Sequence, residues 1–305
     1  MQESYIATRS GSELLCRSWL PETEPVGVVQ LVHGIAEHTG RYDEFARFLT
    51  SHGYVVVAED HMGHGGSINE VTPQGCFAGG WSAAVGDLYN LYEMTRLQYP
   101  ELPYFLFGHS MGSFLARSFL IDYPEASLSG AILSGTAWQP APVISAGKAL
   151  CRLEIQRLGA QGISNSVYNM AFGSYNKAFE PVRTPCDWLS RDEERVDDYV
   201  ADPLCGFIPS VGLLGAMMDG LGYNQKPGNL AKMNKALPVY FMSGDKDPVG
   251  AQGKGVTQSA EAFQKAGMQD VEVRLYPGGR HEMLNELNRD AVYAAILAWL
   301  EKKRA

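Results

Sequence analysis

Ser110 lies at the centre of a Gly-x-Ser-x-Gly pattern, between Gly108 and Gly112. The apolar run at 104–107 is typical of a buried strand, and apolar residues at helical spacing follow it over 111–123. A strand, a sharp turn and a helix expose a serine hydroxyl at the edge of a sheet, and the glycines avoid Cβ collisions where the backbone bends. The segment therefore predicts a nucleophilic serine, and the alternative is an ordinary strand-to-helix turn.

A serine hydroxyl becomes a good nucleophile only when a base accepts its proton, and that base needs a carboxylate to fix its tautomer. Where a serine occupies such a turn, the order along the chain is serine, acid, histidine. Of the seven histidines, only His281 follows Ser110. We therefore expect His281, in a Gly-rich loop after the apolar run at 271–276, to be the base.

Two aspartates in the segment SGDKDPVG are candidates for the acid. They follow the apolar run at 237–243, which places them in a loop at the carboxyl end of an expected strand. Asp247 is favoured, because the three residues after Gly244 let the loop turn back toward His281. Asp245 is the alternative, and its more usual role is to bond the backbone of its own turn.

The oxyanion of a tetrahedral intermediate needs two backbone N–H donors, one just after the nucleophile and one after an earlier strand. Met111 directly follows Ser110 and is expected to supply the first. The apolar run at 28–32 leads into a His-Gly pair that ends at Gly34. Because Gly34 permits a bend, we expect the N–H of Ile35 to be the second donor, and a plain turn is the alternative.

Asp60, His61 and His64 form a polar cluster in a Gly-rich loop after the apolar run at 54–58. An acid and two histidines also suggest a metal site. We instead expect these side chains to bond backbone groups near the oxyanion turn. No other cysteine or carboxylate cluster in the sequence completes a metal-ligand set, so we expect neither a metal nor a cofactor.

Composition limits the class of protein. The chain has 305 residues, 45% of them hydrophobic, which is enough to bury the core of one large domain. Its net charge of −9 argues against nucleic acid as a partner. The five cysteines form no CxxC pair, and we find neither a signal peptide nor a membrane-spanning run. These features predict a soluble, cytoplasmic protein.

Strand-like runs alternate with helical patterns along most of the chain, as in a mostly parallel sheet covered by helices on both faces. The expected strands are 14–20, 27–32, 54–58, 104–107, 128–134, 237–243 and 271–276, and the expected helices are 41–51, 81–98, 111–123, 257–266 and 290–302. The pattern thus predicts an α/β fold.

A long interval between Ser134 and Leu237 interrupts this alternation. It carries helical patterns at 143–158 and 211–221, and a capping box from Ser190 to Glu193 that predicts a further helix. We therefore expect a core of residues 1–135 and 236–305, with a helical cap at 136–235 that lies over the site.

Five segments are distinctive together: HGIAEHTGRY at 33–42, DHMGHGGS at 60–67, GHSMGS at 108–113, GDKDPV at 244–249 and the loop of His281. They resemble the α/β-hydrolase group that contains monoacylglycerol lipases and lysophospholipases.

This resemblance implies an α/β-hydrolase fold with a mostly parallel sheet and a helical cap. It also implies Ser110 as nucleophile, Asp247 as acid, His281 as base, and Ile35 and Met111 as oxyanion donors. The implied activity is hydrolysis of monoacylglycerol or lysophospholipid-type esters through an acyl-serine intermediate, without a cofactor.

The expected cap carries apolar residues that are candidates for an acyl-chain pocket. They are Phe207, Leu213, Leu214, Met217 and Met218. The alternative is that this apolar stripe packs on the sheet domain. The cap is also a candidate for transient contact with a membrane surface.

Other functions use the same three residues. A short-chain or aromatic-ester esterase is one alternative, and a peptidase that recruits Glu193, Glu194 or Asp202 to bind a substrate amine is another. A ligand-binding protein that has lost turnover is a third, and the intact serine, aspartate and histidine argue against it. Haloalkane and epoxide hydrolases have an aspartate at the position of Ser110, which argues against those activities.

Overall fold

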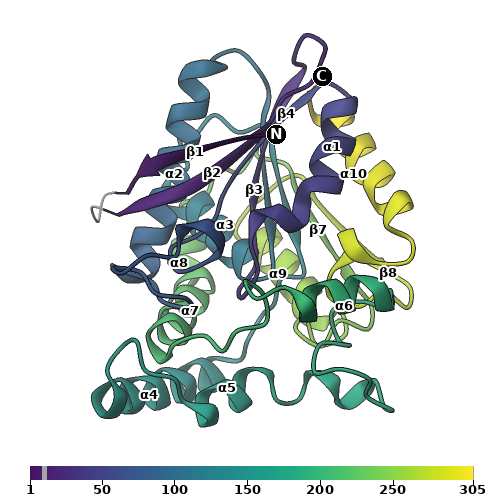
Figure 1. Ribbon diagram of the computed structural model, residues 1–305. Coiled ribbons are helices and arrows are strands. Elements are labelled where there is room, and N and C mark those ends of the chain that lie inside the picture. Colours follow the sequence, from purple (N-terminus) through teal and green to yellow (C-terminus); the bar gives the residue numbers. More distant parts are fainter. Residues whose placement is uncertain (9–11, 305) are drawn as a thin grey trace.

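The computed structural model describes residues 1–8 and 12–304, arranged around an eight-stranded sheet (Figure 1). The strand order is β1-β2-β4-β3-β5-β6-β7-β8. The strands are β1 Gln2–Ala7, β2 Glu13–Trp19, β3 Gly27–Val32, β4 Tyr54–Glu59, β5 Tyr104–His109, β6 Gly130–Ser134, β7 Val239–Gly244 and β8 Val271–Tyr276. The pairs β1–β2 and β2–β4 are antiparallel, and the other neighbouring pairs are parallel. The predicted α/β fold with a mostly parallel sheet is confirmed.

Helices cover both faces of the sheet. They are α1 Asp43–Ser51, α2 Gly80–Gln98, α3 Met111–Asp122, α9 Lys254–Lys265 and α10 Arg289–Arg304, with the short 3₁₀ helices η1 Thr39–Tyr42, η2 Gly65–Ser67 and η4 Met283–Asn285. Residues of α1 and α10 share one buried apolar cluster with the sheet, and residues of α2, α3 and α9 share another. Every residue of β3 to β7 is buried, which explains their unbroken apolar runs.

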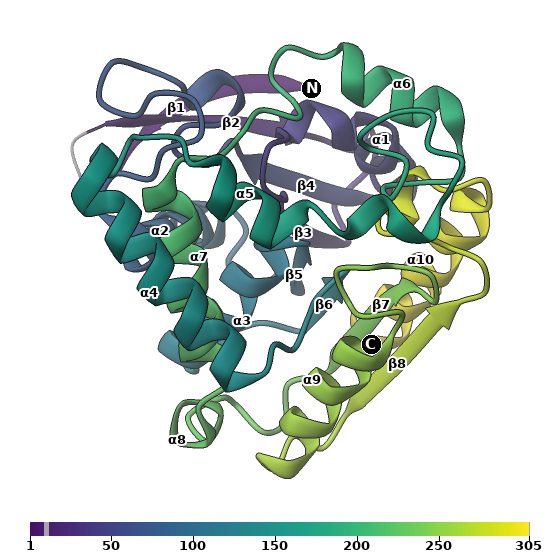
Figure 2. The same cartoon turned by 90° about the horizontal axis from the view of Figure 1, so that it is seen from below.

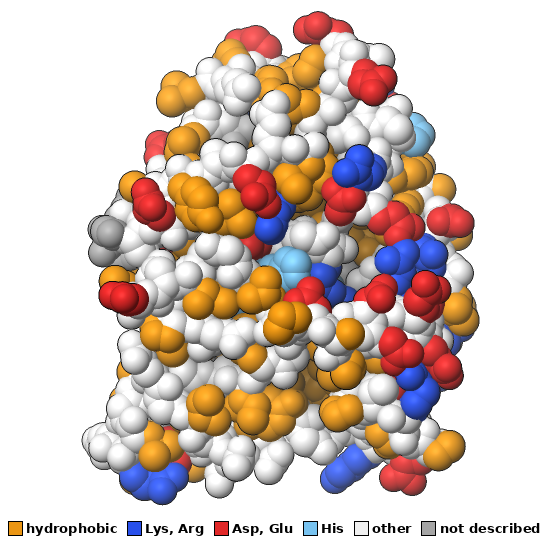
Figure 3. All heavy atoms as spheres, in the orientation of Figure 1, with side chains coloured by type: hydrophobic (Ala, Val, Ile, Leu, Met, Phe, Trp, Pro, Cys, Tyr) orange, Lys and Arg blue, Asp and Glu red, His pale blue; other side chains and the backbone are white. Residues whose placement is uncertain are grey.

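A helical insertion separates β6 from β7. It contains α4 Ala141–Leu158, α5 Asn165–Phe172, η3 Tyr175–Ala178, α6 Glu193–Ala201, α7 Val211–Asn224 and α8 Pro227–Leu230. In Figures 1 and 2, α4, α5 and α6 lie at one end of the sheet, and α7 packs between α4 and α3. Figure 3, in the orientation of Figure 1, shows hydrophobic side chains over the lower part of the visible face and intermixed positive and negative charges toward its right side. Ion pairs of Arg195 with Glu44 and of Arg289 with Asp192 join α6 and its N-cap to α1 and α10.

Two features of the structure differ from the sequence analysis. The predicted capping box from Ser190 to Glu193 is wrong, although a helix does follow it. The N-cap of α6 is Asp192, whose carboxylate accepts a hydrogen bond from the N–H of Arg195. Ser190 instead donates its hydroxyl to the carbonyl of Asn285 at 2.8 Å, outside the helix. Strand β1 was not predicted, because all its residues except Ile6 are exposed and give no apolar alternation.

Candidate active site

Ser110 lies in a strained turn between β5 and α3. Its φ of 51° and ψ of −121° are a conformation that residues with a Cβ atom rarely adopt. The N–H of Ser110 donates to the carbonyl of Ser134 at 2.9 Å, which ties the turn to β6. A Cβ atom on Gly112 would lie 2.1 Å from the carbonyl oxygen of Val32, so only glycine lets α3 approach the end of β3 this closely. The sheet thus presents the serine on a rigid support.

A cavity of about 510 Å³ lies between Ser110 and the insertion. Gly34, Ile35, Ser110, Met111 and His281 line it from the sheet domain. Its remaining walls are largely apolar and aromatic, and include Trp138, Tyr168, Phe172, Tyr175, Trp188, Phe207, Met217, Met218 and Leu221. The structure therefore brings the predicted nucleophile, base and oxyanion residues to one apolar chamber.

Asp247 and His281 form a buried pair beside this cavity. The Asp247 Oδ2 atom lies 3.0 Å from His281 Nδ1, and it also accepts a 2.8 Å hydrogen bond from the hydroxyl of Ser243. The other carboxylate oxygen accepts the N–H of Val249 at 2.9 Å. The Nε2 atom of His281 is buried and has no hydrogen-bond partner among the described residues. The structure places Asp245 elsewhere, where its carboxylate accepts the N–H of Gly278 at 2.8 Å.

The attraction between Asp247 and His281 outweighs the effect of burial on both of their pKa values. Burial alone would raise the pKa of Asp247, but the adjacent His281 and the hydrogen bonds to the carboxylate lower it below its ordinary value. Burial alone would lower the pKa of His281, but the charge and hydrogen bond of Asp247 raise it above its ordinary value. The aspartate is therefore ionised, and the imidazole is a stronger base than burial alone would allow.

The turn after β3 lies directly against the serine. A Cβ atom on Gly34 would lie 3.1 Å from the Cβ atom of Ser110 and 2.7 Å from Glu37 Oε1. The N–H of Gly34 donates to Glu37 Oε1 at 2.6 Å. Met111 is the first residue of α3, and the first N–H groups of a helix have no acceptor within it. The turn after β3 and the first residue of α3 thus both lie next to the serine.

A buried ionic network, absent from the sequence analysis, flanks this turn. Arg41 donates to Glu37 Oε2 at 2.6 Å and to both carboxylate oxygens of Glu282 at 2.7 Å. Tyr42 donates its hydroxyl to Glu37 Oε1 at 2.8 Å. The i,i+4 spacing of Glu37 and Arg41, and the position of Glu282 next to His281, were the available signals.

The five predicted cap residues divide into two groups. Phe207, Met217 and Met218 line the cavity. Leu213 and Leu214 do not, because they are 0% and 1% exposed and pack in the cluster that joins α7 to the sheet domain. On α7 the apolar positions therefore divide between the cavity, at Met217 and Met218, and the packing of the helix on the sheet, at Leu213 and Leu214. The acyl-chain pocket stays a prediction.

The polar loop after β4 bonds backbone groups, as expected. Asp60 accepts the N–H of Thr39 and the N–H of Gly66, each at 2.8 Å. His61 Nε2 lies 3.1 Å from the carbonyl of His33, and His64 Nδ1 lies 2.9 Å from the carbonyl of Met62. Asp60 and His61 thus join the loop after β4 to the loop after β3, and His64 bonds within its own loop.

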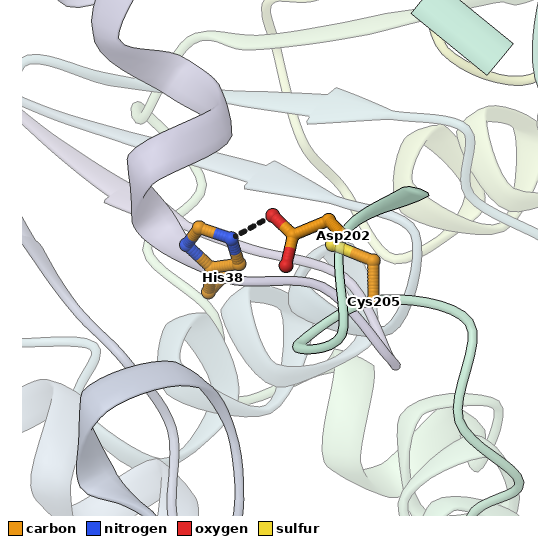
Figure 4. A group of neighbouring side chains, drawn as sticks. All are labelled: His38, Asp202 and Cys205. Carbon is orange, nitrogen blue, oxygen red and sulfur yellow. Dashed lines mark hydrogen bonds and ion pairs between the residues drawn. The ribbon is translucent and has the colours of Figure 1, made fainter. Parts of the chain in front are cut away.

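His38, Asp202 and Cys205 lie close enough together to suggest a metal site (Figure 4). His38 Nδ1 accepts the N–H of Gly40 at 3.2 Å, so its proton is on Nε2, which donates to Asp202 Oδ2 at 2.9 Å. A metal would need Nε2 free of that proton. The cluster is a hydrogen-bonded contact between the insertion and the loop after β3.

The insertion also contacts the loop of His281 directly. The N–H of His281 donates to the carbonyl of Trp188 at 3.4 Å, and the N–H of Glu282 donates to the carbonyl of Leu189 at 2.8 Å. Arg280 donates to the carbonyl of Ser190 at 3.0 Å. The insertion therefore supports the backbone on both sides of the imidazole.

Comparison with known proteins gives the family. A family model described as serine aminopeptidase, S33, matches residues 23–288. The chain belongs to this family of α/β hydrolases. This hydrolase is 32% identical to a monoacylglycerol lipase of Mycolicibacterium smegmatis over 98% of this chain and 96% of that protein.

Two further similarities extend over nearly the whole hydrolase. A monoglyceride lipase of Rattus norvegicus is 28% identical over 99% of this chain and 91% of its own. The crystal structure of a thermostable carboxyl esterase from Bacillus coagulans, in complex with glycerol, matches with a TM-score of 0.92 at 31% identity. That match covers 100% of this chain and 99% of the esterase.

Proposed function

We propose that this hydrolase cleaves carboxylic esters, with Ser110 as nucleophile. In this mechanism His281 Nε2 accepts the serine proton as Oγ attacks the carbonyl carbon, and Asp247 stabilises the imidazolium. The N–H groups of Ile35 and Met111 stabilise the oxyanion. Collapse of the intermediate releases the alcohol with the proton from His281, and water then hydrolyses the acyl-serine.

One observation carries this proposal. A histidine whose Nδ1 atom is bonded to a buried carboxylate, and whose Nε2 atom has no partner among the described residues, lines the same cavity as a serine in a strained turn. The serine, histidine and carboxylate of acyl-transfer enzymes have these relationships.

We propose monoacylglycerol or lysophospholipid-type lipids as the substrates. The largely apolar walls of the cavity favour an acyl chain over a polar substrate. Met217 and Met218 line the cavity with flexible side chains that adapt to such a chain. The relatives named monoacylglycerol lipase and monoglyceride lipase support the same substrate class. We also propose that residues 136–235 act as a cap on a core of residues 1–135 and 236–305.

The charges in the cavity argue against a peptidase. Among the described residues that line it, the acids are Glu37 and Glu282, and both pair with Arg41. The candidates Glu193, Glu194 and Asp202 do not line the cavity, and Asp202 bonds His38. The carboxylates that a substrate amine would meet in the cavity, Glu37 and Glu282, are therefore already paired with the guanidinium of Arg41.

A panel of substrates tests this function. We expect turnover of monoacylglycerols and of p-nitrophenyl esters, with a preference for medium or long chains over acetate, and little turnover of aminoacyl amides. Ser110→Ala is expected to abolish turnover and retain the thermal unfolding transition. Faster cleavage of amides than of esters would favour the peptidase, a preference for acetate or aromatic esters would favour the esterase, and unchanged turnover in Ser110→Ala would refute the mechanism.

The cavity also has an apolar rim. Val143 and Met170 line it, yet their side chains are 49% and 44% exposed. We propose that this rim contacts lipid surfaces transiently, although no described helix is long and apolar enough to span a membrane. Val143→Asp and Met170→Asp are expected to slow hydrolysis of monoacylglycerol presented in phosphatidylcholine vesicles. Hydrolysis of a water-soluble ester by these variants should stay within twofold of the parent, and equal rates on vesicles would refute the contact.

A cytoplasmic location remains our prediction. All five cysteines are free thiols, and four of them are buried. Thiols persist in a reducing compartment, which supports that location.

A further inference from the structure

The imidazole of His33 contacts the carbonyl of Gly34, on the opposite side of the peptide unit from the N–H of Ile35. That N–H and the carbonyl of Gly34 belong to one peptide bond, and in a trans peptide the two groups point in opposite directions. The Nδ1 atom of His33 lies 2.7 Å from the Gly34 carbonyl oxygen. A group that fixes this carbonyl on one side therefore fixes the direction of the N–H on the other.

The hydrogen-bond pattern assigns the tautomer of His33. The backbone N–H of His61 donates to His33 Nε2 at 2.9 Å, so Nε2 carries no proton. The proton of the neutral ring is then on Nδ1, and it is donated to the carbonyl of Gly34. His33 is 0% exposed, and burial lowers its pKa well below its ordinary value, so the ring stays neutral.

The imidazole is itself held in place. His61 Nε2 lies 3.1 Å from the carbonyl of His33, and the two rings are 4.0 Å apart between centroids. On the preceding peptide, Glu37 accepts the N–H of Gly34. Buried side chains therefore hold both polar groups of the His33–Gly34 peptide, and His33 holds the carbonyl of the next peptide, Gly34–Ile35.

We propose that His33 is a positioning residue, which orients the Gly34–Ile35 peptide so that the N–H of Ile35 faces the oxyanion formed at Ser110. This inference rests on the proposed function, in which that N–H is an oxyanion donor. Without His33 the peptide rotates more freely, and the donor must be ordered during each catalytic cycle. Loss of His33 should therefore raise the free energy of the transition state and lower kcat, and substrate binding should be unaffected.

Two isosteric variants separate the two hydrogen bonds of the ring. In His33→Asn, the amide nitrogen occupies the place of Nδ1 and keeps the donor to Gly34, but it loses the acceptor for the N–H of His61. In His33→Gln, the amide oxygen takes the place of Nε2 and keeps that acceptor, but it loses the donor to Gly34. His64→Asn is the matched control, because His64 lies in the same ring cluster and its Nδ1 atom faces the carbonyl of Met62.

Loss of one oxyanion donor lowers kcat by roughly 10²–10³-fold, so a disordered donor in His33→Gln is expected to lower it by about 10–100-fold. The KM for a p-nitrophenyl ester should stay within about twofold. Affinity for an alkyl boronic acid, which forms a tetrahedral adduct with serine, should fall by the same factor as kcat. His33→Asn and His64→Asn should keep kcat within about threefold, and all variants are compared by thermal unfolding.

Wild-type kcat in a folded His33→Gln variant would overturn the proposal, as would equal losses in His33→Asn and His33→Gln. If His33→Gln does not fold, ¹⁵N NMR of the wild-type imidazoles decides. We expect the Nδ1–H tautomer for His33 from pH 6 to 9, and the Nε2–H tautomer would refute the proposal. Turnover by Ser110→Ala would instead refute the function itself, so the two failures are distinguishable.

Discussion

Arg41 forms two hydrogen bonds of 2.7 Å to the carboxylate of Glu282, and so joins the turn after β3 to the residue beside His281. Burial alone would raise the pKa of Glu282, but the charge and hydrogen bonds of Arg41 lower it below its ordinary value. Because the folded pKa is lowered, this stabilisation is present above the ordinary value of 4.5 and is lost as pH falls through the lowered pKa.

Replacement of Arg41 by methionine leaves two buried carboxylates without their partner. We expect a loss of about 3–5 kcal/mol in the free energy of unfolding at pH 7, measured by urea denaturation. Arg47→Met is the control, because the pair of Arg47 with Asp43 lies on the exposed side of α1 and should contribute little. Equal effects of the two substitutions would contradict this account.

The pH dependence of turnover should follow His281. Only the neutral imidazole accepts the serine proton, so kcat/KM should fall as pH decreases through the pKa of His281. Because Asp247 raises that pKa, the acidic limb should lie above the ordinary value of 6.5. Asp247→Asn removes the largest influence that raises the pKa of His281 and leaves burial opposed only by the charges of Glu282 and Glu37. The limb should therefore move to lower pH while kcat falls by about 10⁴-fold. An unmoved limb in a pH–rate profile of the variant would argue against this pair as the base.

Replacement of glycine by alanine should have opposite effects on stability at Gly112 and at Gly86. A Cβ atom on Gly112 would lie 2.1 Å from a backbone oxygen, so Gly112→Ala should shift α3, lower the unfolding temperature and abolish turnover. Gly86 lies within α2, and an added Cβ would have no atom of another part of the fold within 4 Å, so Gly86→Ala should stabilise by about 0.5–1 kcal/mol. Calorimetry and an ester assay would check both, and an active Gly112→Ala variant would contradict the close approach.

Two positions of α7 should respond differently to mutation. Met217 lines the cavity, so Met217→Trp should fill part of it and shift the preference toward shorter p-nitrophenyl esters. Leu214 is buried away from the cavity, so Leu214→Ala should cost about 2–5 kcal/mol in stability and leave the chain-length preference unchanged. A changed preference in Leu214→Ala would mean that the acyl chain extends behind α7.

Local patterns predicted most of the fold. The runs at 27–32 and 271–276 coincide with β3 and β8, because turn residues bound them on both sides. Strand β1 and the N-cap Asp192 were missed, since the first is an exposed edge and the second depends on where Ser190 bonds in three dimensions.

The candidate site was predictable where chemistry dictates residue type. The order of serine, aspartate and histidine along the chain suggested Ser110 and His281, which line one cavity, and Asp247, which bonds His281 beside it. The pairing of Arg41 with Glu282 spans 241 positions, and no local pattern reports it. The sequence also did not show which apolar residues of α7 line the cavity. Leu214 and Met217 are both apolar, and their position relative to the neighbouring helices decides which of them lines it.

The carbonyls of Trp188 and Leu189 accept the N–H groups of His281 and Glu282. A chimaera that exchanges the whole insertion for that of a related protein would therefore lose the backbone contacts that support His281, the proposed base. A viable exchange would leave this short stretch in place and replace only the helices before it. Substrate range could then be redesigned through α4 and α5 without disturbing proton transfer.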